Sequence, residues 1–244
     1  MVERNTIVGL NFLISGVIIA LLGYVLVQSI PITAFGFALA VIGSVMLLVV
    51  SEPIPQDTFK SLLKDSISNV EIILEESSLH ERAYFFPSGS EEQVRALVPF
   101  SQQIVSTISS QSILQSIEKL QRRFIVNSGD LRGLLVVPPG SELVNLVKVE
   151  KGSDIEDSLS STLVGFSDLA SSVSAISEES VGQIRIEIRK PKITSDSISF
   201  NECLGSPVSC VASCVVAKCV GSPVRIVDEK FQRAMTRLTL QIIR

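Results

Sequence analysis

The first fifty residues constrain this chain more than any other stretch, because no Asp, Glu, Lys or Arg occurs between Arg4 and Glu52. Two apolar runs, Ile7–Val27 and Ile32–Val50, fill the stretch, and Gln28-Ser29-Ile30-Pro31 separates them. A helix rises about 1.5 Å per residue, so about twenty apolar residues cross a hydrocarbon core about 30 Å thick. The pattern therefore predicts a helical hairpin through a membrane.

We expect a first domain at residues 1–52, with membrane-spanning helices at about 7–28 and 32–50. The first run is long for a signal peptide and lacks a small-residue cleavage site, so we expect it to be retained. The short loop between the runs carries no charge, whereas Arg4, Lys60 and Lys64 flank the hairpin. The positive-inside tendency then predicts a multi-pass cell-membrane protein with both termini in the cytoplasm.

Glycines recur at intervals of seven residues in both apolar runs, which aligns them on one stripe of each helix. Small residues let helices approach closely in lipid. The stripes therefore predict helix packing, either between the two helices of one chain, which we favour, or between copies in a homo-oligomer. These glycines are Gly9, Gly16, Gly23, Gly36 and Gly43.

Charge and composition exclude some partners of the remaining residues, 53–244. The formal net charge is −4, and basic residues form no extended cluster. Nucleic-acid surfaces need clustered Lys and Arg, so we expect no nucleic acid as a partner. We expect the lipid bilayer as one partner, and a small ligand or a protein as another.

The four cysteines are the strongest candidates for chemistry, and they lie in one short segment, at 203, 210, 214 and 219. Cys210 and Cys214 are four residues apart and share a helix face, which makes them a candidate ligand-binding pair. The spacing lacks the close pairs typical of zinc sites, so we expect no metal and no cofactor. A thiol-dependent or redox enzyme is the alternative, and a role as small core hydrophobes is the simplest interpretation.

The first half of the second domain shows alternating helix and hairpin signals. Apolar residues at three- and four-residue spacing predict an amphipathic helix over Phe59–Leu74. β-rich runs at Arg82–Pro87 and Gln93–Phe100 predict a hairpin, and a loose helical period suggests a helix near Ser110–Arg122. A turn then leads into an apolar strand at Leu131–Val137.

The second half begins with a predicted long helix, whose apolar positions run from Ile155 to Ile176 over a serine-rich opposite face. Gln183–Arg189 alternates as a strand with one buried face. Ser206-Pro207 and Gly221 predict the start and end of a buried apolar helix. Strands at Pro223–Val227 and Arg233–Ile243 complete an α+β domain at residues 53–244, with two similar halves at 53–150 and 151–244.

One family resemblance rests on Gln183–Arg244, about a quarter of the chain. The order is a strand, a cysteine-bearing apolar helix, the motif Gly-x-Pro-Val-Arg-Ile-x-x-Glu at 221–229, and a final strand ending in Ile-Ile-Arg. This order resembles the C-terminal half of V4R (4-vinyl-reductase-like) domains, and the resemblance implies small-molecule binding. The cysteines of the last hairpin of such domains are missing here, with Phe231 and Leu238 nearby instead, so no metal ligand carries over.

No catalytic motif occurs: the sequence contains no GxGxxG, P-loop, GxSxG or HExxH, and His80 is its single histidine. We therefore expect a membrane-anchored binding protein whose cytoplasmic α+β domain takes a small ligand or a protein partner. The alternatives are a thiol-dependent enzyme that uses the Cys203–Cys219 segment and a membrane organiser that oligomerises through the glycine stripes.

Overall fold

The computed structural model describes residues 2–48, 56–87, 93–100, 124–128, 131–178 and 182–243. The chain divides into two compact units, Met1–Pro55 and Gln56–Arg244. The fold class is α+β, since an apolar helical unit is followed by antiparallel strands and helices.

The first unit is a hairpin of two packed helices, α1 (Val2–Leu22) and α2 (Ile30–Leu48). A π-helical turn, η1 (Gly23–Val27), extends α1, and Gln28 then takes a left-handed conformation with φ 49°. The connection is shorter than the expected Gln28–Pro31 loop, because Pro31 already lies in the first turn of α2. Proline is tolerated there, since the first helical N–H groups have no intrahelical acceptor.

Among the described residues, three helical stretches are long and apolar enough to cross a membrane: Val8–Leu26, Ile30–Leu47 and Ile198–Val220. The first two belong to the hairpin, and only 22% and 11% of their residues are buried. The third belongs to the second unit, where 89% of it is buried. The two N-terminal helices thus expose apolar surface that could face lipid, whereas the third is covered by protein.

In the described part of the second unit, eight strands form one antiparallel sheet in the order β3-β4-β2-β1-β7-β8-β6-β5. The first half of the unit supplies the hairpins β1 (Tyr84–Pro87) with β2 (Val94–Pro99), and β3 (Ile125–Ser128) with β4 (Leu131–Val136). The second half supplies β5 (Ser172–Glu178) with β6 (Gln183–Arg189), and β7 (Val224–Gln232) with β8 (Met235–Ile242).

Both halves join their hairpins in the same way, because the second strands of the two hairpins pair with each other, as β2 with β4 and β6 with β8. The halves meet through a short pairing of β1 with β7, in which Tyr84 lies opposite Arg225 and Phe85 opposite Val224. The expected alternation of β6 is confirmed: Ile184, Ile186 and Ile188 are buried.

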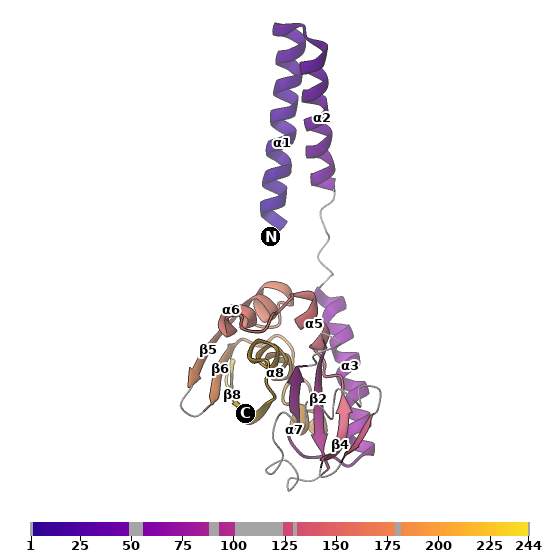
Figure 1. Cartoon of the computed structure of the whole chain (residues 1–244), viewed down its shortest axis with the longest axis vertical. Helices are drawn as coiled ribbons and strands as arrows, with labels where there is room; N and C mark the ends of the chain where they lie inside the picture. Colours follow the sequence, from indigo (N-terminus) through magenta and orange to yellow (C-terminus); the bar gives the residue numbers. More distant parts are fainter. Residues whose placement is uncertain are drawn as a thin grey trace. The chain divides into compact units, whose positions relative to one another are not determined.

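Helix α8 (Pro207–Val220) lies at the centre of this unit, with β5, β6 and β8 on one side of it and β2 and β4 on the other (Figure 1). The predicted start and end of this helix are confirmed. The Ser206 side chain accepts a hydrogen bond from the Ser209 N–H, Pro207 follows at the first helical position, and Gly221 ends the helix with φ 66°. An apolar helix of this kind is stable in water only when protein covers it on all sides.

Helix α3 (Gln56–Glu76) confirms the predicted amphipathic helix and packs against α7 (Ile198–Leu204). Its buried residues, Leu63, Ile67, Val70 and Leu74, belong to the same hydrophobic core as α8. Helix α5 (Ser141–Leu146), strand β3 and helix α7 are short elements that the sequence patterns did not predict. The helix expected near Ser110–Arg122 lies outside the described residues.

The predicted long helix from Ile155 to Ile176 is wrong in its second part. The described chain forms α6 (Ile155–Leu159) and a π-helical segment, η3 (Ser160–Phe166), and then β5 pairs along β6. Serine is a weak helix former, so the segment gains more from the backbone hydrogen bonds that β6 offers than from continuing as a helix. Asp168 takes a positive φ of 49° where the chain turns toward the sheet.

Candidate functional site

The four cysteines are all buried free thiols. Cys210 and Cys214 lie one helical turn apart on α8, and the Cys210 thiol donates a 3.3 Å hydrogen bond to the Pro139 carbonyl oxygen. The Cys203 thiol likewise donates to the Leu79 carbonyl oxygen at 3.3 Å. These hydrogen bonds join α8 to the loop at Pro139 and α7 to the segment at Leu79. Both sulfur atoms are buried away from solvent.

The environment of three of these thiols, those of Cys203, Cys210 and Cys219, favours the neutral form. Burial is the main reason why the pKa of Cys210 lies well above its ordinary value, and the neighbouring Cys214 adds to the shift. Burial raises the pKa of Cys203 to about 11, with a further contribution from Glu202. Burial also raises the pKa of Cys219. A nucleophilic cysteine needs the opposite, a lowered pKa and access to solvent.

Metal binding also finds no ready site in the described part of the chain. Among those residues, which include the four cysteines and His80, no three His, Cys, Asp or Glu side chains lie together as a metal site would require. Cys210 and Cys214, the expected ligand pair, both belong to the buried hydrophobic core.

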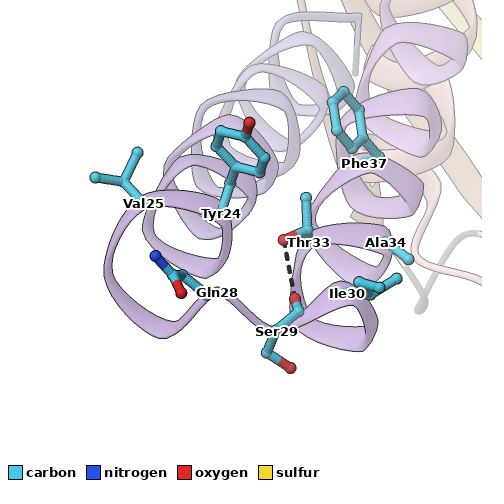
Figure 2. Close-up of a pocket in the computed structure, with 8 residues that line it drawn as sticks. All are labelled: Tyr24, Val25, Gln28, Ser29, Ile30, Thr33, Ala34 and Phe37. Atoms are coloured by element: carbon cyan, nitrogen blue, oxygen red, sulfur yellow. Dashed lines mark hydrogen bonds between the residues drawn. The ribbon is translucent and has the colours of Figure 1, made fainter.

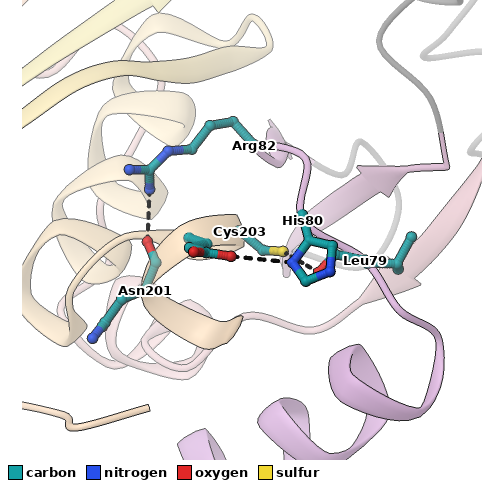
Figure 3. Close-up of polar contacts among 6 residues, drawn as sticks. Leu79, His80, Arg82, Asn201 and Cys203 are labelled. Carbon is teal, nitrogen blue, oxygen red and sulfur yellow. Dashed lines mark hydrogen bonds and ion pairs between the residues drawn. The ribbon is translucent and has the colours of Figure 1, made fainter. Parts of the chain in front are cut away.

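His80 lies in a polar junction between the Leu79–Ala83 segment and α7 (Figure 3). Its Nδ1 atom lies 3.1 Å from a Glu202 carboxylate oxygen, at an exposed position. The Arg82 guanidinium donates to the Asn201 carbonyl oxygen at 2.7 Å, and the Ala83 N–H donates to the Cys203 carbonyl oxygen at 2.8 Å. These contacts join segments about 120 residues apart in the chain, so the junction stabilises the fold.

An open groove of about 690 Å³ lies where the beginning of α6 meets strand β5. The Asp154 carboxylate caps α6 by accepting a 2.9 Å hydrogen bond from the Asp157 N–H. The Glu156 carboxylate reaches β5, where it accepts a 2.9 Å hydrogen bond from the Ala175 N–H. Three carboxylates thus lie along this groove, those of Asp154, Glu156 and Asp157.

Strand β5 is the last strand of the sheet on this side, so one of its edges has no neighbouring strand among the described residues. Its seven residues contain one charge, Glu178, which lies 3.2 Å from Arg185. Ile176 on this strand is 66% exposed. Edge strands usually carry lysines or proline that block added strands, and β5 carries neither.

A smaller groove of about 350 Å³ lies between α3 and residues 193–197. Lys64, Glu71 and Asp196 contribute charged side chains of both signs to it. The Ser197 hydroxyl donates to the Glu71 carboxylate at 2.5 Å, and the Asn201 amide donates to the Ser195 carbonyl oxygen at 2.9 Å. Several of its polar groups therefore already bind one another.

The five glycines of the hairpin lie where α1 and α2 pack together. A Cβ atom on Gly16 would lie 2.8 Å from the Gly36 carbonyl oxygen, and one on Gly43 would lie 2.8 Å from the Gly9 carbonyl oxygen. A Cβ atom on Gly23 would lie 2.9 Å from the Thr33 nitrogen. Side chains larger than hydrogen do not fit at such distances, so this contact within one chain occupies the glycine stripes.

Sequence reasoning missed the groove at α6 and β5, because it assigned a helix to the residues that form β5. One signal pointed to a strand: Val173 and Ala175 alternate with serines in the period of two that is typical of strands. Both of these side chains pack against the hydrophobic core.

Fold and site together define a two-part protein, an apolar helical hairpin joined to an antiparallel α+β unit with an open, acidic sheet edge. A family model, Domain of unknown function (DUF7982), matches residues 2–242, so the chain belongs to this family. Searches of the curated proteins and of the solved structures found no match. The resemblance of Gln183–Arg244 to V4R domains gains no support, because the family match is to DUF7982 over nearly the whole chain.

Proposed function

We propose that this protein is anchored in a membrane by its hairpin and that its α+β unit binds a protein partner at the open edge of β5. The anchor rests on one observation above all. Between Val8 and Met46 the large apolar side chains point mostly outward, as Leu21, Tyr24 and Phe37 do with exposed fractions of 59%, 73% and 63%. So large an apolar surface is stable in lipid and is a liability in water.

The proposed topology places both termini in the cytoplasm. Arg4 precedes the hairpin, and Lys60 and Lys64 follow it, whereas the two residues at its tip, Gln28 and Ser29, are uncharged. Positive residues near membrane helices favour the cytoplasmic side. The α+β unit would then meet partners inside the cell, where buried thiols also stay reduced.

The partner that fits the β5 edge is an extended peptide with basic side chains. In the free protein the Glu156 carboxylate accepts the Ala175 N–H, so it replaces the carbonyl oxygen of a missing neighbouring strand. An added strand would take over this N–H and release Glu156 to pair with a lysine or arginine of the peptide. Asp154 and Asp157 beside the groove add to the attraction for a basic partner.

The two alternatives have less support. A thiol-dependent enzyme would need an accessible thiolate, and Cys210 is buried with a raised pKa. An organiser built on the glycine stripes would need those stripes free for another chain, and Gly16, Gly36 and Gly43 lie against the other helix of their own hairpin.

The anchor is tested by fractionating cells that produce the full chain and extracting the membranes with alkaline carbonate. We expect the chain to stay in the membrane pellet, because two apolar helices hold it there. Recovery in the carbonate supernatant would refute the anchor.

The binding site is tested with the full chain in lipid nanodiscs and a fluorescent peptide of four Lys-Val repeats. We expect binding that weakens with added salt, and weaker or no binding of a Glu-Val repeat. Ile176→Lys places a positive charge on the edge, so affinity should fall about tenfold, the equivalent of about 1.4 kcal/mol. Ile198→Lys changes another exposed isoleucine, on α7, and should leave the affinity unchanged. Equal binding of both variants, or of both peptides, would refute the site.

A further inference from the structure

The sheet of the second unit repeats one order of strands. Each half contains two hairpins, which β1 and β3 begin in the first half and β5 and β7 begin in the second. Across the sheet the halves run as β3-β4-β2-β1 and then as β7-β8-β6-β5. The strands β1 and β5 therefore hold equivalent places in their halves, and so do β3 and β7.

The two halves join where β1 meets β7, in an antiparallel pairing of Tyr84 with Arg225 and of Phe85 with Val224. The equivalents of these two strands, β5 and β3, are the two ends of the same sheet. Strand β5 and strand β4, the neighbour of β3, lie on opposite sides of the unit, so one chain does not pair its own two edges (Figure 1). A second copy can supply β3 to β5 in the way that β7 is supplied to β1.

The backbone groups at the open edge of β5 come from every second residue. The Ala175 N–H donates to the Glu156 carboxylate in the groove at this edge, so it points away from β6. Successive residues of a strand alternate between its two sides, and Val173 and Ser177 therefore face the same edge. The side chains of Val173 and Ala175 pack against the hydrophobic core.

The open edge of β3 has a matching arrangement. The Phe124 carbonyl oxygen accepts a 2.7 Å hydrogen bond from the Leu135 N–H of β4, so the next residue, Ile125, directs its backbone groups toward the open edge. Ile125 pairs with Leu134, a core residue, which places its side chain on the core face. At both edges the residues that offer backbone groups thus carry core-facing side chains. A sheet joined at these edges keeps its core on one side.

Charge favours the pairing of unlike edges. The β5 edge carries the carboxylates of Asp154, Glu156 and Asp157 along its groove. Residues 122–132, which include β3, contain three arginines and one aspartate. Two β5 edges would bring carboxylates together, and two β3 edges would bring arginines together. Only β5 with β3 joins opposite charges.

We infer that the partner of the β5 edge is a second copy of this chain, whose β3 adds antiparallel to β5. The inference names the partner of the proposed β5 site and rests on that proposal. Pairing releases Glu156 from the Ala175 N–H and places it near the arginines of the other copy. It also covers Ile125 and Phe124, which are 59% and 66% exposed in one copy. Each contact leaves one β3 and one β5 for a further copy or for closure into a ring.

Salt dependence separates this contact from association through the hairpin. The hollow at the tip of the hairpin is lined by uncharged side chains, among them Tyr24, Gln28 and Phe37 (Figure 2). Association through such a surface should change little with added salt. Association of β5 with β3 should weaken, because salt screens the attraction between exposed charges.

The test is sedimentation of the full chain in detergent, with one variant for each edge. Ile176→Lys repels the arginines of the other copy, and Ile125→Glu repels the carboxylates, so each should raise the dissociation constant about tenfold. Ile198→Lys, at an exposed position of α7, should not. An absence of self-association in the unaltered chain, or an equal effect of all three variants, would overturn the inference.

A mixture of the two edge variants distinguishes unlike from like edges. Each variant retains the edge that the other lacks, so we expect association of the two different chains in the mixture, which also shows that both are folded. Loss of association in Ile176→Lys alone would mean that two β5 edges pair, and loss in Ile125→Glu alone would mean that two β3 edges pair. Either result would overturn the inference.

Photo-cross-linking provides a measurement that does not depend on weakening the contact. With benzoylphenylalanine at position 176 and an isotopically heavy second copy, we expect cross-links to residues 124–128 of the other chain. Cross-links between copies that fall on β5 or on the hairpin instead would overturn the inference.

The peptide of four Lys-Val repeats separates a failure of this inference from a failure of the proposed site. We expect the peptide to bind and to dissociate the copies, since both occupy β5. A chain that binds the peptide and never self-associates would overturn the inference and retain the site. A chain that neither binds the peptide nor self-associates would overturn both.

Discussion

The Ser209 hydroxyl donates a 2.6 Å hydrogen bond to the Glu229 carboxylate, which places a negative charge from β7 against the first turn of the central helix α8. The Ser206 N–H also donates to both oxygens of this carboxylate, at 3.2 Å each. The first N–H groups of a helix have no intrahelical acceptor, and the helix dipole favours an anion there. Glu229 therefore joins the last hairpin to the helix at the centre of the unit.

Replacing Glu229 with glutamine should destabilise the α+β unit. We expect Glu229→Gln to lower the free energy of unfolding by about 1 to 2 kcal/mol, because the charge is lost and an amide serves fewer donors. The measurement is urea unfolding of the full chain in detergent, followed by circular dichroism. Asp228→Asn is the matched control, since Asp228 pairs with Lys230 at an exposed position and should contribute little. An equal effect of both substitutions would contradict this role of Glu229.

Stability should fall in alkaline solution, partly because of Cys203. Burial raises its pKa from 9.0 to about 11, so the folded chain keeps a proton that the unfolded chain releases in this interval. The unfolded state then binds fewer protons, and the free energy of unfolding decreases as the pH rises from about 9 to about 11. Cys203→Ser retains a donor for the Leu79 carbonyl oxygen without a thiol, so it should make this decrease shallower. An unchanged slope in the variant would contradict the assignment.

All four thiols should be protected in the folded protein. We expect Ellman's reagent at pH 8 to react slowly with the native chain and completely with the urea-unfolded chain, because each thiol is buried. The measurement is the absorbance time course with and without urea. Rapid reaction of one native thiol would support the thiol-enzyme alternative, and single alanine variants of the four cysteines would identify which residue reacts.

Two glycine-to-alanine changes should differ sharply in their effect on the hairpin. A Cβ atom on Gly36 would lie 2.7 Å from the Ala20 Cα atom, whereas one on Gly9 would lie 3.2 Å from the Met46 side chain. We expect Gly36→Ala to destabilise the helix contact by about 1 to 3 kcal/mol and Gly9→Ala to have less effect. Energy transfer between dyes coupled to unnatural amino acids at the two ends of the hairpin measures the separation. Equal transfer in both variants would contradict the observed packing.

Local chemistry was sufficient to predict several elements of the fold. Ser206, Pro207 and Gly221 identify the ends of α8 because capping depends only on adjacent residues. The alternation of Ile184, Ile186 and Ile188 identifies β6 because one face of that strand is buried. The segment after Phe166 was assigned wrongly, since its weak local preference was overridden by pairing with β6.

The candidate sites were less predictable than the fold. The cysteines stood out in sequence because they are few and close together, yet all four are buried in the hydrophobic core. The acidic groove could not be predicted from the sequence. It depends on a hydrogen bond between the Glu156 carboxylate of α6 and the N–H of Ala175, nineteen residues later on the edge strand β5. Such a contact depends on the sheet that brings the two segments together.

The sequence by itself determined that an uncharged apolar hairpin begins this chain and that an α+β unit follows, because charge, capping and periodicity act over neighbouring residues. Only the tertiary structure decided which strands lie at the two edges of the sheet and that α8 packs between the two ends of the sheet. It also decided that the glycine stripes of α1 and α2 face each other within one chain. These features depend on contacts between segments far apart in sequence, whose free energy appears only when the whole unit packs together.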